Sequence, residues 1–474
     1  MATSGMTFAQ SSITIRTERL ESLRRGLRGR LCLPGDPGYD EARSIWNAMI
    51  DRRPAAIVRA EIADDVVAAV NFARENGLEL AVKGAGHNIA GNAVSQGGLM
   101  LDLSPMKAIQ IDAAARTARV APGVTLGELD QATQAHGLAL PLGINSTTGV
   151  AGLTLGGGFG WLSRKHGLTI DNLTAAEVVT ADGRSHRASE KDDAELFWAV
   201  RGGGGNMGVV TSFEYRLHPV GPEVFAGLIV HPFDGARTLL QGYREVVARV
   251  PEDLTVWAVL RQAPPLPFVP TEWHGREVLI FAFCYIGGVA NGEGAIAPLR
   301  ALGKPVAEHV GAMPLVGWQT AFDPLLAPGA RNYWKSHDFK QLDDGTIGAI
   351  VDAVRRLPSP ECEVFIGHLG GAINRVPVAA TAYPHRDVQF VMNVHTRWRE
   401  ASQDASCIAW ARELFEAAAP FATGGVYVNF MPDDERARVQ TGAYGPNFAR
   451  LATLKAKYDP DNLFRLNQNV APAR

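Results

Sequence analysis

The sequence predicts an α+β protein, in which short strands and helices are followed by an antiparallel sheet with helices packed on one face. Three observations support this prediction. From Pro54 to Pro219 short apolar strands alternate with amphipathic helices. After Pro219 long β-type runs are interleaved with helices. Finally, the 474 residues include 50 glycines, well above the usual share, and the excess is concentrated in a few loops.

The elements of the first half follow from local patterns. Residues 64–75 show helical spacing with an acidic first turn, and residues 124–135 form a helix that ends at Gly137. Asp182-Gly183 marks a hairpin turn after a strand. We predict strands over 78–82, 99–103, 109–111, 177–181 and 209–217, and a further short helix over 193–200.

The second half has longer strands. Four prolines between residues 264 and 270 mark a loop, because proline neither continues a helix nor donates to a strand ladder. After Pro420 the chain is rich in glycine, asparagine and tyrosine. We predict strands over 224–230, 254–260, 278–285 and 390–398, and helices over 236–248, 346–357 and 404–419.

Composition favours an enzyme that acts on small molecules. Hydrophobic residues make up 46% and charged residues 20%, with a net charge of −3, so no basic surface field calls for nucleic acid or a membrane partner. No apolar stretch is long enough to span a bilayer and no secretory signal is recognisable, which predicts a cytoplasmic protein. The four cysteines form no CxxC pair and are expected to be buried, without a metal site. They are Cys32, Cys284, Cys362 and Cys407.

Residues 80–92 (LAVKGAGHNIAGN) combine a strand with a glycine-rich turn that carries one histidine, His87. Glycines at 84, 86 and 91 allow backbone N–H groups to approach an anionic ligand. Taken alone, the segment fits either a cofactor loop or a tight turn with an exposed histidine.

Three other segments are also rich in glycine or in small polar residues. They are 141–160 (PLGINSTTGVAGLTLGGGFG), 201–208 (RGGGGNMG) and 458–469 (YDPDNLFRLNQN). Gly203, Gly205 and Gly208 satisfy the GxGxxG pattern, but they follow a predicted helix and precede a strand. Because the dinucleotide fingerprint needs the order strand then helix, we reject a Rossmann interpretation.

Together these motifs resemble the berberine-bridge-enzyme-like group of FAD-linked oxidases, within the vanillyl-alcohol-oxidase or PCMH-type flavoprotein superfamily. Residues 83–91 resemble the family's R/K-x-G-G-H-x-x-x-G turn. Residues 147–152 with 156–158 match the second flavin loop, 201–208 the third, and 427–429 with 467–469 the C-terminal return. The resemblance is specific in these loops and weak between about residues 224 and 380.

The resemblance implies a two-part FAD-binding domain of PCMH type with an inserted substrate domain. We expect the FAD-binding parts at 1–219, with a core at about 54–219, and at 420–474, and the substrate-binding domain at 220–419. It also implies that His87 bonds covalently to the flavin's ring methyl carbon, where neutral imidazole is a competent nucleophile. The cofactor-binding positions implied are Lys83, Gly84, Ala85, Gly86, His87, Asn88, Gly91, Asn92, Asn145, Thr147, Thr148, Gly149, Gly152, Gly157, Gly158, Gly203, Gly204, Asn206, Gly208, Val210, Tyr427, Asn467 and Asn469.

Two positions refine the prediction. Many relatives have a cysteine where this chain has Asn145, and its sulfur makes a second bond to the flavin ring. Asparagine cannot, so we expect the bacterial-type arrangement, with FAD attached through His87 only and a more open cleft. Thr148 matches a position that helps decide oxygen access, and its valine-sized side chain favours an oxidase.

On the substrate side the resemblance implies a proton-accepting group. Asn393 matches a polar catalytic position, and His395 lies on the same face of the predicted strand 390–398. The alternative is that this face packs against solvent or a helix. Phe430 and Ile89 stand where relatives have tyrosine, whereas Tyr427 is retained. Tyr333 and Trp334 are candidate pocket residues, 383–386 (YPHR) resembles a structural turn, and the predicted catalytic residues are Asn393, His395, Tyr427 and Thr148.

The predicted function is an FAD-dependent oxidase that takes hydride from a small organic substrate and reduces dioxygen to hydrogen peroxide. The scarcity of acid and base groups favours an amine, while an alcohol or a sugar-like compound of secondary metabolism stays open. A dehydrogenase with another electron acceptor and a flavin-binding protein without turnover are the alternatives.

Overall fold

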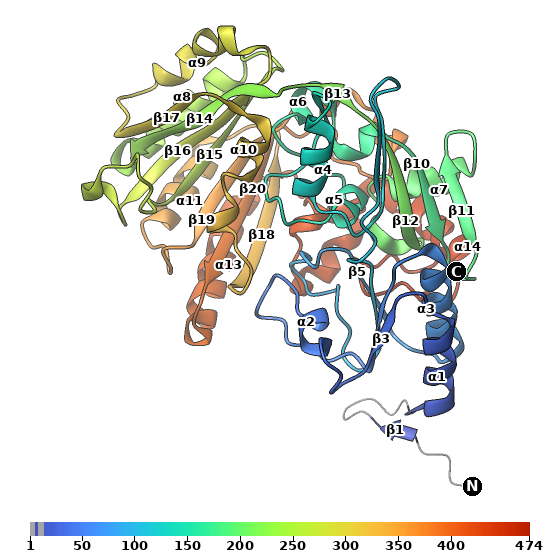
Figure 1. Ribbon diagram of the computed structural model, residues 1–474. Coiled ribbons are helices and arrows are strands. Elements are labelled where there is room, and N and C mark those ends of the chain that lie inside the picture. The colour runs from blue at the N-terminus through green and yellow to red at the C-terminus, as the bar shows by residue number, and fades with distance from the viewer. Residues whose placement is uncertain (1–4, 8–13) are drawn as a thin grey trace.

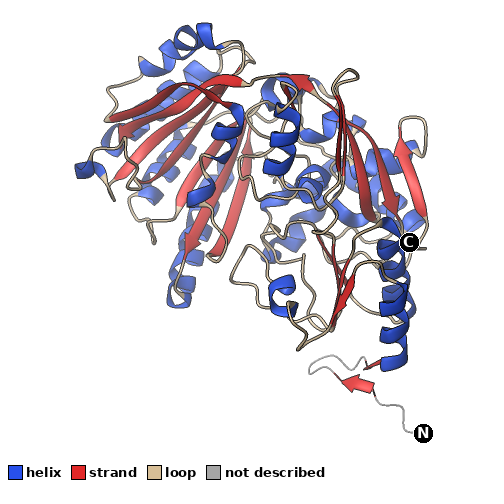
Figure 2. Cartoon of the chain, viewed as in Figure 1, coloured by secondary structure: helices blue, strands red, loops and turns tan. Residues whose placement is uncertain are grey.

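A computed structural model describes residues 5–7 and 14–474 (Figure 1). Three larger sheets organise the fold, with β1 (Gly5–Thr7) and β2 (Thr14–Arg16) forming a separate short pair near the N-terminus. The largest sheet lies on one side of the molecule, and the two others lie on the opposite side with the returning C-terminus (Figures 1 and 2). This mixed arrangement confirms the α+β prediction.

The first sheet carries the histidine turn. Its order is β3-β4-β6-β5, and β4, β6 and β5 run parallel. Apolar side chains of two helices, including Leu20 and Val66, pack with those of the strands. The elements are α1 (Thr17–Gly26), β3 (Arg30–Cys32), α2 (Tyr39–Arg43), β4 (Ala56–Arg59), α3 (Ala63–Glu75), β5 (Leu80–Lys83) and β6 (Leu99–Asp102).

The second sheet is antiparallel, in the order β11-β10-β12-β8-β7. Its helix α4 begins after Thr125, whose hydroxyl accepts the Glu128 N–H while the Glu128 carboxylate accepts the Thr125 N–H. This reciprocal cap explains a start two residues later than predicted. The elements are β7 (Ile109–Asp112), β8 (Thr117–Val120), α4 (Leu126–Gln134), α5 (Val150–Leu155), α6 (Ser163–His166), β10 (Leu173–Val179), β11 (Ser185–Ser189), α7 (Ala194–Val200) and β12 (Val209–Arg216).

The third sheet has seven antiparallel strands in the order β17-β14-β16-β15-β19-β20-β18. Helices α8, α9, α11 and α13 pack on one face (Figure 2), and their apolar side chains form one core with the strands. The elements are β14 (Glu223–Pro232), α8 (Ala236–Val247), β15 (Leu254–Gln262), β16 (Glu277–Tyr285), α9 (Gly292–Arg300), β17 (Ala307–Pro314), α10 (Leu315–Thr320), β18 (Arg331–Phe339), α11 (Asp344–Val354), β19 (Glu363–His368), α12 (Ala372–Arg375), β20 (Phe390–Trp398) and α13 (Asp404–Ala418).

The C-terminal segment returns to the second sheet. After the 3₁₀ turn η10 (Val428–Phe430), helix α14 (Phe448–Tyr458) packs beside α7, and its Leu451 and Leu454 join the core of that sheet (Figure 1). Strand β9 (Leu138–Ala139) forms a short antiparallel pair with β13 (His218–Pro219), and β13 directly precedes the first strand of the large sheet in the sequence. The domain boundaries at 219 and 419 stay a prediction.

Several elements were not predicted. Strands β17 and β18 have sequences AEHVGAMP and RNYWKSHDF, in which polar residues occupy both faces. The polar residues of β18 after Arg331 are buried, because both faces of the strand meet other parts of the protein instead of solvent. Polarity alternation therefore fails to mark the strand. The buried cysteines agree with the prediction.

Candidate functional site

A cleft separates the glycine loops from the face of the seven-stranded sheet that is turned away from α11 and α13. One wall is formed by the turn after β5, the loop that leads into α5, and residues 204–210 before and within β12. Turn η10 and residues 466–468 close the wall from the C-terminal side. The opposite wall carries side chains of β15, β18, β19 and β20.

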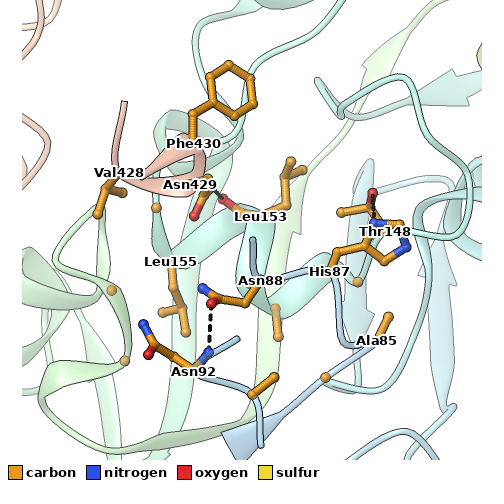
Figure 3. Close-up of a pocket in the computed structure, with 18 of the residues that line it drawn as sticks. Ala85, His87, Asn88, Asn92, Thr148, Leu153, Leu155, Val428, Asn429 and Phe430 are labelled. Carbon is orange, nitrogen blue, oxygen red and sulfur yellow. Dashed lines mark hydrogen bonds between the residues drawn. The ribbon is translucent and has the colours of Figure 1, made fainter. Parts of the chain in front are cut away.

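His87 lies in the first wall, between two threonine hydroxyls and an indole. Thr147 Oγ1 is 2.9 Å from its Nε2. Thr148 Oγ1 is 3.4 Å from its Nδ1 (Figure 3). The ring of Trp46 stacks on the imidazole with centroids 5.2 Å apart. Burial lowers the pKa of His87 to about 4, so the imidazole is neutral at physiological pH and retains a nucleophilic nitrogen.

Two glycine loops meet closely beside this histidine. A Cβ atom at Gly149 would lie 2.9 Å from the backbone nitrogen of Ala85, a contact that only glycine avoids. Gly86 has a φ of +79°, in the left-handed region. Asn88 Oδ1 accepts the Asn92 N–H at 2.9 Å and fixes the turn (Figure 3). The spacing of glycines in the sequence thus reflects backbone packing.

The first wall is shaped to receive a ligand. Gly152 and Gly205 both line the cleft, and a Cβ atom at either position would meet no protein atom within 4 Å. Asn467 also lines the cleft, and its Oδ1 is buried without a hydrogen-bond partner in the described part of the chain. Buried polar atoms are rarely left unpaired, so this amide fits hydrogen bonding to a bound molecule.

Most of the predicted cofactor positions line the cleft. Besides His87 they come from all four motifs, including the C-terminal one. They are Gly84, Ala85, Gly86, Asn88, Asn92, Asn145, Thr148, Gly149, Gly152, Gly204, Gly208, Val210, Tyr427 and Asn467.

The other predicted positions lie outside the cleft lining. Lys83 Nζ donates to the carbonyl of Ala42 at 2.7 Å, and Asn206 Oδ1 accepts the Val470 N–H at 2.9 Å. Both side chains therefore bind protein backbone and support the wall from outside. Thr147 contacts His87, and Gly158 donates its N–H to Tyr427. Gly91, Gly157, Gly203 and Asn469 are likewise absent from the lining.

Tyr427 lines the cleft, but its hydroxyl is held by the protein. The oxygen accepts the Gly158 N–H at 3.0 Å and the Asn429 amide at 3.0 Å. Burial raises the pKa of Tyr427 to about 12, so the phenol stays protonated at neutral pH. Tyr427 is therefore a poor base. Its hydroxyl oxygen already accepts two hydrogen bonds, so it can interact with a ligand only by donating its own proton.

The opposite wall brings together Asn393 and His395, as their shared strand face predicts. Both side chains are buried, with exposed fractions of 4% and 7%. Asn393 Oδ1 and His395 Nε2 have no hydrogen-bond partner in the described residues. This face of the strand therefore lines the cleft and does not pack against solvent or a helix.

Sequence reasoning missed Glu363, which also lines the cleft. Its Oε1 is 3.1 Å from Nδ1 of His395, and its Oε2 accepts Arg261 Nη1 at 2.6 Å. Burial would raise the pKa of Glu363, but Arg261, His395 and Arg397 outweigh it and lower that pKa to about 2. The sequence offers one indication of this position. In EVFIGH, residues 363–368, alternate side chains lie on the same strand face, which places Glu363 and Phe365 together.

Aromatic rings fill much of the lining. Trp334 was predicted to line the pocket and does, whereas the neighbouring Tyr333 points away and donates its hydroxyl to Asp434 at 2.6 Å. Phe430 lies edge-on to Trp334 at 5.6 Å. Ile89 is buried outside the cleft lining. Trp46, Phe159, Trp257 and Phe365 also line the cleft, and none of these four was predicted.

Comparison with known proteins agrees with this geometry. A family model described as FAD binding domain matches residues 54–189, and one described as berberine and berberine like matches residues 426–471. A FAD-linked oxidoreductase of Dictyostelium discoideum is 33% identical over 90% of this chain and 91% of its own length. The chain belongs to the berberine-bridge-enzyme-like family of FAD-linked oxidoreductases.

Two further relatives of this family are informative. The (R)-6-hydroxynicotine oxidase of Paenarthrobacter nicotinovorans is 31% identical and covers 94% of this chain and 97% of its own length. The crystal structure of 6-hydroxy-D-nicotine oxidase from Arthrobacter nicotinovorans superimposes with a TM-score of 0.85 at 29% identity, covering 94% of this chain and 98% of that one. The PCMH-type fold and the FAD-dependent oxidoreductase class are thereby confirmed.

The cleft fits FAD, because the glycine loops leave room for a ligand and Asn467 offers an unpaired polar atom beside them. The flavin ring supplies a two-electron acceptor when bound. In the described residues no helix is long and apolar enough to cross a membrane. The same residues contain no group of three or more side chains suited to a metal ion.

Proposed function

We propose that this protein is an FAD-dependent oxidase that removes hydride from a small organic substrate and uses dioxygen as the final electron acceptor, giving hydrogen peroxide. We further propose that FAD is attached covalently through His87 and nowhere else. The observation that carries the proposal is the neutral imidazole of His87 at the cleft wall, next to the glycine loops.

The attachment proposal rests on the chemistry of His87 and its surroundings. A neutral imidazole nitrogen has the lone pair that a bond to the flavin's ring methyl carbon requires. The two threonine hydroxyls and the Trp46 stack restrain the ring in one orientation. Asn145 lines the cleft where a second, sulfur-mediated attachment would occur, and its amide Oδ1 accepts the hydroxyl of Thr147 at 2.7 Å.

The oxidase proposal rests on Thr148 and on the relatives. Thr148 lines the cleft beside His87, and its side chain is small enough to leave space for dioxygen near the ring. Relatives that match most of the chain include an enzyme named as an oxidase of hydroxynicotine. The site residues we assign to the reaction itself are Asn393 and His395, with Thr148 and Tyr427 on the flavin side.

Two measurements test the proposal. Acid precipitation of the purified protein should leave yellow flavin in the pellet, and His87→Ala should move that colour to the supernatant. Mixing the chemically reduced protein with air should restore the oxidised flavin spectrum rapidly with release of hydrogen peroxide. Wild-type flavin that washes out in acid would overturn the attachment, and slow reoxidation would favour a dehydrogenase.

A further inference from the structure

Four side chains form a continuous row across the cleft face of the seven-stranded sheet. Arg261 of β15 pairs in register with Glu363 of β19, Glu363 pairs with His395 of β20, and His395 pairs with Trp334 of β18. Directly paired residues on neighbouring strands present their side chains on the same face. The row is therefore fixed by the register of four strands, and every side chain in it is held by its neighbour.

His395 is oriented by both of its neighbours in this row. Its Nδ1 lies 3.1 Å from the Glu363 carboxylate, and the ring of Trp334 stands edge-on to the imidazole, 4.7 Å away at 77°. Because an ionised carboxylate only accepts hydrogen bonds, Nδ1 carries a proton, and in the neutral imidazole Nε2 therefore presents a lone pair. That Nε2 is buried without a partner in the described residues, and His395 lines the cleft.

We propose that Glu363 and His395 form a proton-accepting dyad, in which His395 is the catalytic base and Glu363 its positioning residue, and that the substrate is an aryl-substituted alcohol. This inference rests on the proposed hydride-transfer function and deepens it. The sequence alone pointed to a site poor in acid and base groups, and the dyad changes that description.

The choice of a hydroxyl follows from charge and hydrogen bonding. An Nε2 lone pair needs a donor, and a neutral O–H group supplies one. The negative charge of Glu363 is already balanced by Arg261 at 2.6 Å, so the wall offers little attraction to an ammonium group. The planar apolar part of the substrate has aromatic partners in Trp46, Trp334 and Phe430.

The proton and electron balance of the step is complete. With FAD bound, the substrate O–H bond would break and its proton would move to Nε2 of His395, while the neighbouring C–H bond would give up hydrogen with its electron pair to the two-electron acceptor that the flavin supplies. A carbon–oxygen double bond forms, so the alcohol becomes a ketone or an aldehyde. Glu363 stays ionised and stabilises the imidazolium. Dioxygen takes up the two electrons and, with two protons, becomes hydrogen peroxide.

Few charges surround the dyad. Arg261 of β15 binds Glu363, and Arg397, on the same face of β20, donates to Glu361 at 2.9 Å. Strand β18 contributes only the uncharged Trp334 to this row, because Tyr333 and Lys335 point to the other face and bind Asp434. From η10 and its N-cap the cleft receives Tyr427, whose phenol stays neutral. The two arginines near the dyad are thus already paired with carboxylates.

The test uses the flavin-loaded protein and matched probes: 1-phenylethanol and 1-(2-naphthyl)ethanol, their methyl ethers, and the corresponding amines. Anaerobic stopped-flow absorbance gives the rate of flavin reduction from pH 5 to 10. The variants are His395→Gln and Glu363→Gln. His337→Gln is the control, because His337 is a buried histidine on the opposite face of the same sheet that binds the Phe415 carbonyl.

With the alcohols we expect the wild-type rate to rise with pH, because only a neutral imidazole can accept the substrate proton. His395→Gln should slow reduction by about 10²–10⁴-fold and abolish this rise. Glu363→Gln should slow it less and alter the pH profile, because the carboxylate that contacts the imidazole is gone. The control should keep the wild-type profile.

Two readouts do not depend on turnover. ¹⁵N NMR of histidine-labelled protein should show the His395 proton on Nδ1 in the wild type and a shift toward Nε2 in Glu363→Gln. The affinity for the methyl ether, measured by flavin absorbance, should change less than about threefold in Glu363→Gln. A merely structural glutamate would instead weaken ether binding or flavin content and leave the tautomer unchanged.

The outcomes separate this proposal from the oxidase proposal. Reduction by the amines alone, or no reduction by any alcohol of the set, overturns the substrate assignment. A pH profile unchanged in Glu363→Gln overturns the dyad. If alcohols reduce the flavin as described but air reoxidises it slowly, the dyad stands and the oxidase assignment fails.

Discussion

The indole of Trp46 stacks on the imidazole of His87, with the ring centroids 5.2 Å apart and 21° between the ring planes. Trp46 is itself fixed, since its Nε1 donates to the Leu326 carbonyl at 2.8 Å and its ring meets that of Trp334 edge-on at 5.6 Å. A residue from the N-terminal region thus connects His87 to the segment that leads into β18. The stack limits rotation of the imidazole.

Loss of this stack should impair covalent attachment. We expect Trp46→Ala to lower the fraction of acid-stable flavin, because the freed imidazole samples orientations that do not face the ring methyl carbon. Trp46→Phe keeps an aromatic surface and loses only the hydrogen bond, so it should retain more. The ratio of flavin in the acid pellet to total flavin measures the effect. An unchanged ratio in Trp46→Ala would show that the stack plays no part in attachment.

Asn145 provides a test of where the flavin ring lies. Asn145→Cys in a His87→Ala background should restore part of the acid-stable flavin, because the family resemblance puts a bond-forming sulfur at this cleft-lining position. Some stability is lost, since the Asn145 amide accepts hydrogen bonds from Thr147. Mass spectrometry of the flavinylated peptide identifies the attachment point. Asn145→Ser is the matched control, and flavin retained by the serine variant would refute the interpretation.

The role of His87 could be predicted from the sequence, whereas the roles of Glu363 and Trp46 could not, and the difference has a physical reason. His87 belongs to a turn whose glycines are required locally, by close loop packing and positive φ angles, so its motif is contiguous. Glu363 gains its role through register with His395, 32 residues later in a neighbouring strand, and no local pattern encodes that pairing. Trp46 reaches the site from a separate N-terminal loop.

The same distinction applies to residues that were assigned to the cofactor. Lys83 and Asn206 belong to the recognised motifs, yet their side chains bind backbone groups outside the cleft lining. A motif therefore records both the residues that meet the ligand and those that hold the loop in place. Only the folded geometry separates the two groups.

Thr148 should control the reaction with dioxygen. Thr148→Ile adds a bulky apolar group beside His87, where it would fill the space available to dioxygen. We expect reoxidation of the reduced flavin to slow by about tenfold or more, equivalent to ~1.4 kcal/mol in activation free energy. Anaerobic reduction by substrate should change far less. Thr148→Val has nearly the same volume without the hydroxyl and serves as the control, so equal slowing in both variants would assign the effect to lost hydrogen bonding.

Asp130 should make stability depend on pH. This carboxyl of α4 is buried, and burial raises its pKa to about 7 although the Gln319 amide, 3.0 Å away, opposes the shift. The folded protein therefore holds a proton that the unfolded chain releases near pH 4. Folding stability from this group is complete below about pH 4 and decreases as pH rises toward 7.

Asp130→Asn should remove that dependence, because an amide never ionises and its oxygen still accepts the Gln319 N–H. We expect the variant to be more stable than the wild type at pH 8, by on the order of 1–4 kcal/mol, and to differ little near pH 4. Thermal unfolding of the flavin-loaded protein at both pH values measures this. Asp461→Asn removes an exposed carboxylate and should have little effect at either pH. A stabilisation by Asp130→Asn of equal size at both pH values would contradict the assignment, because a proton-linked effect must grow as the wild-type carboxyl ionises.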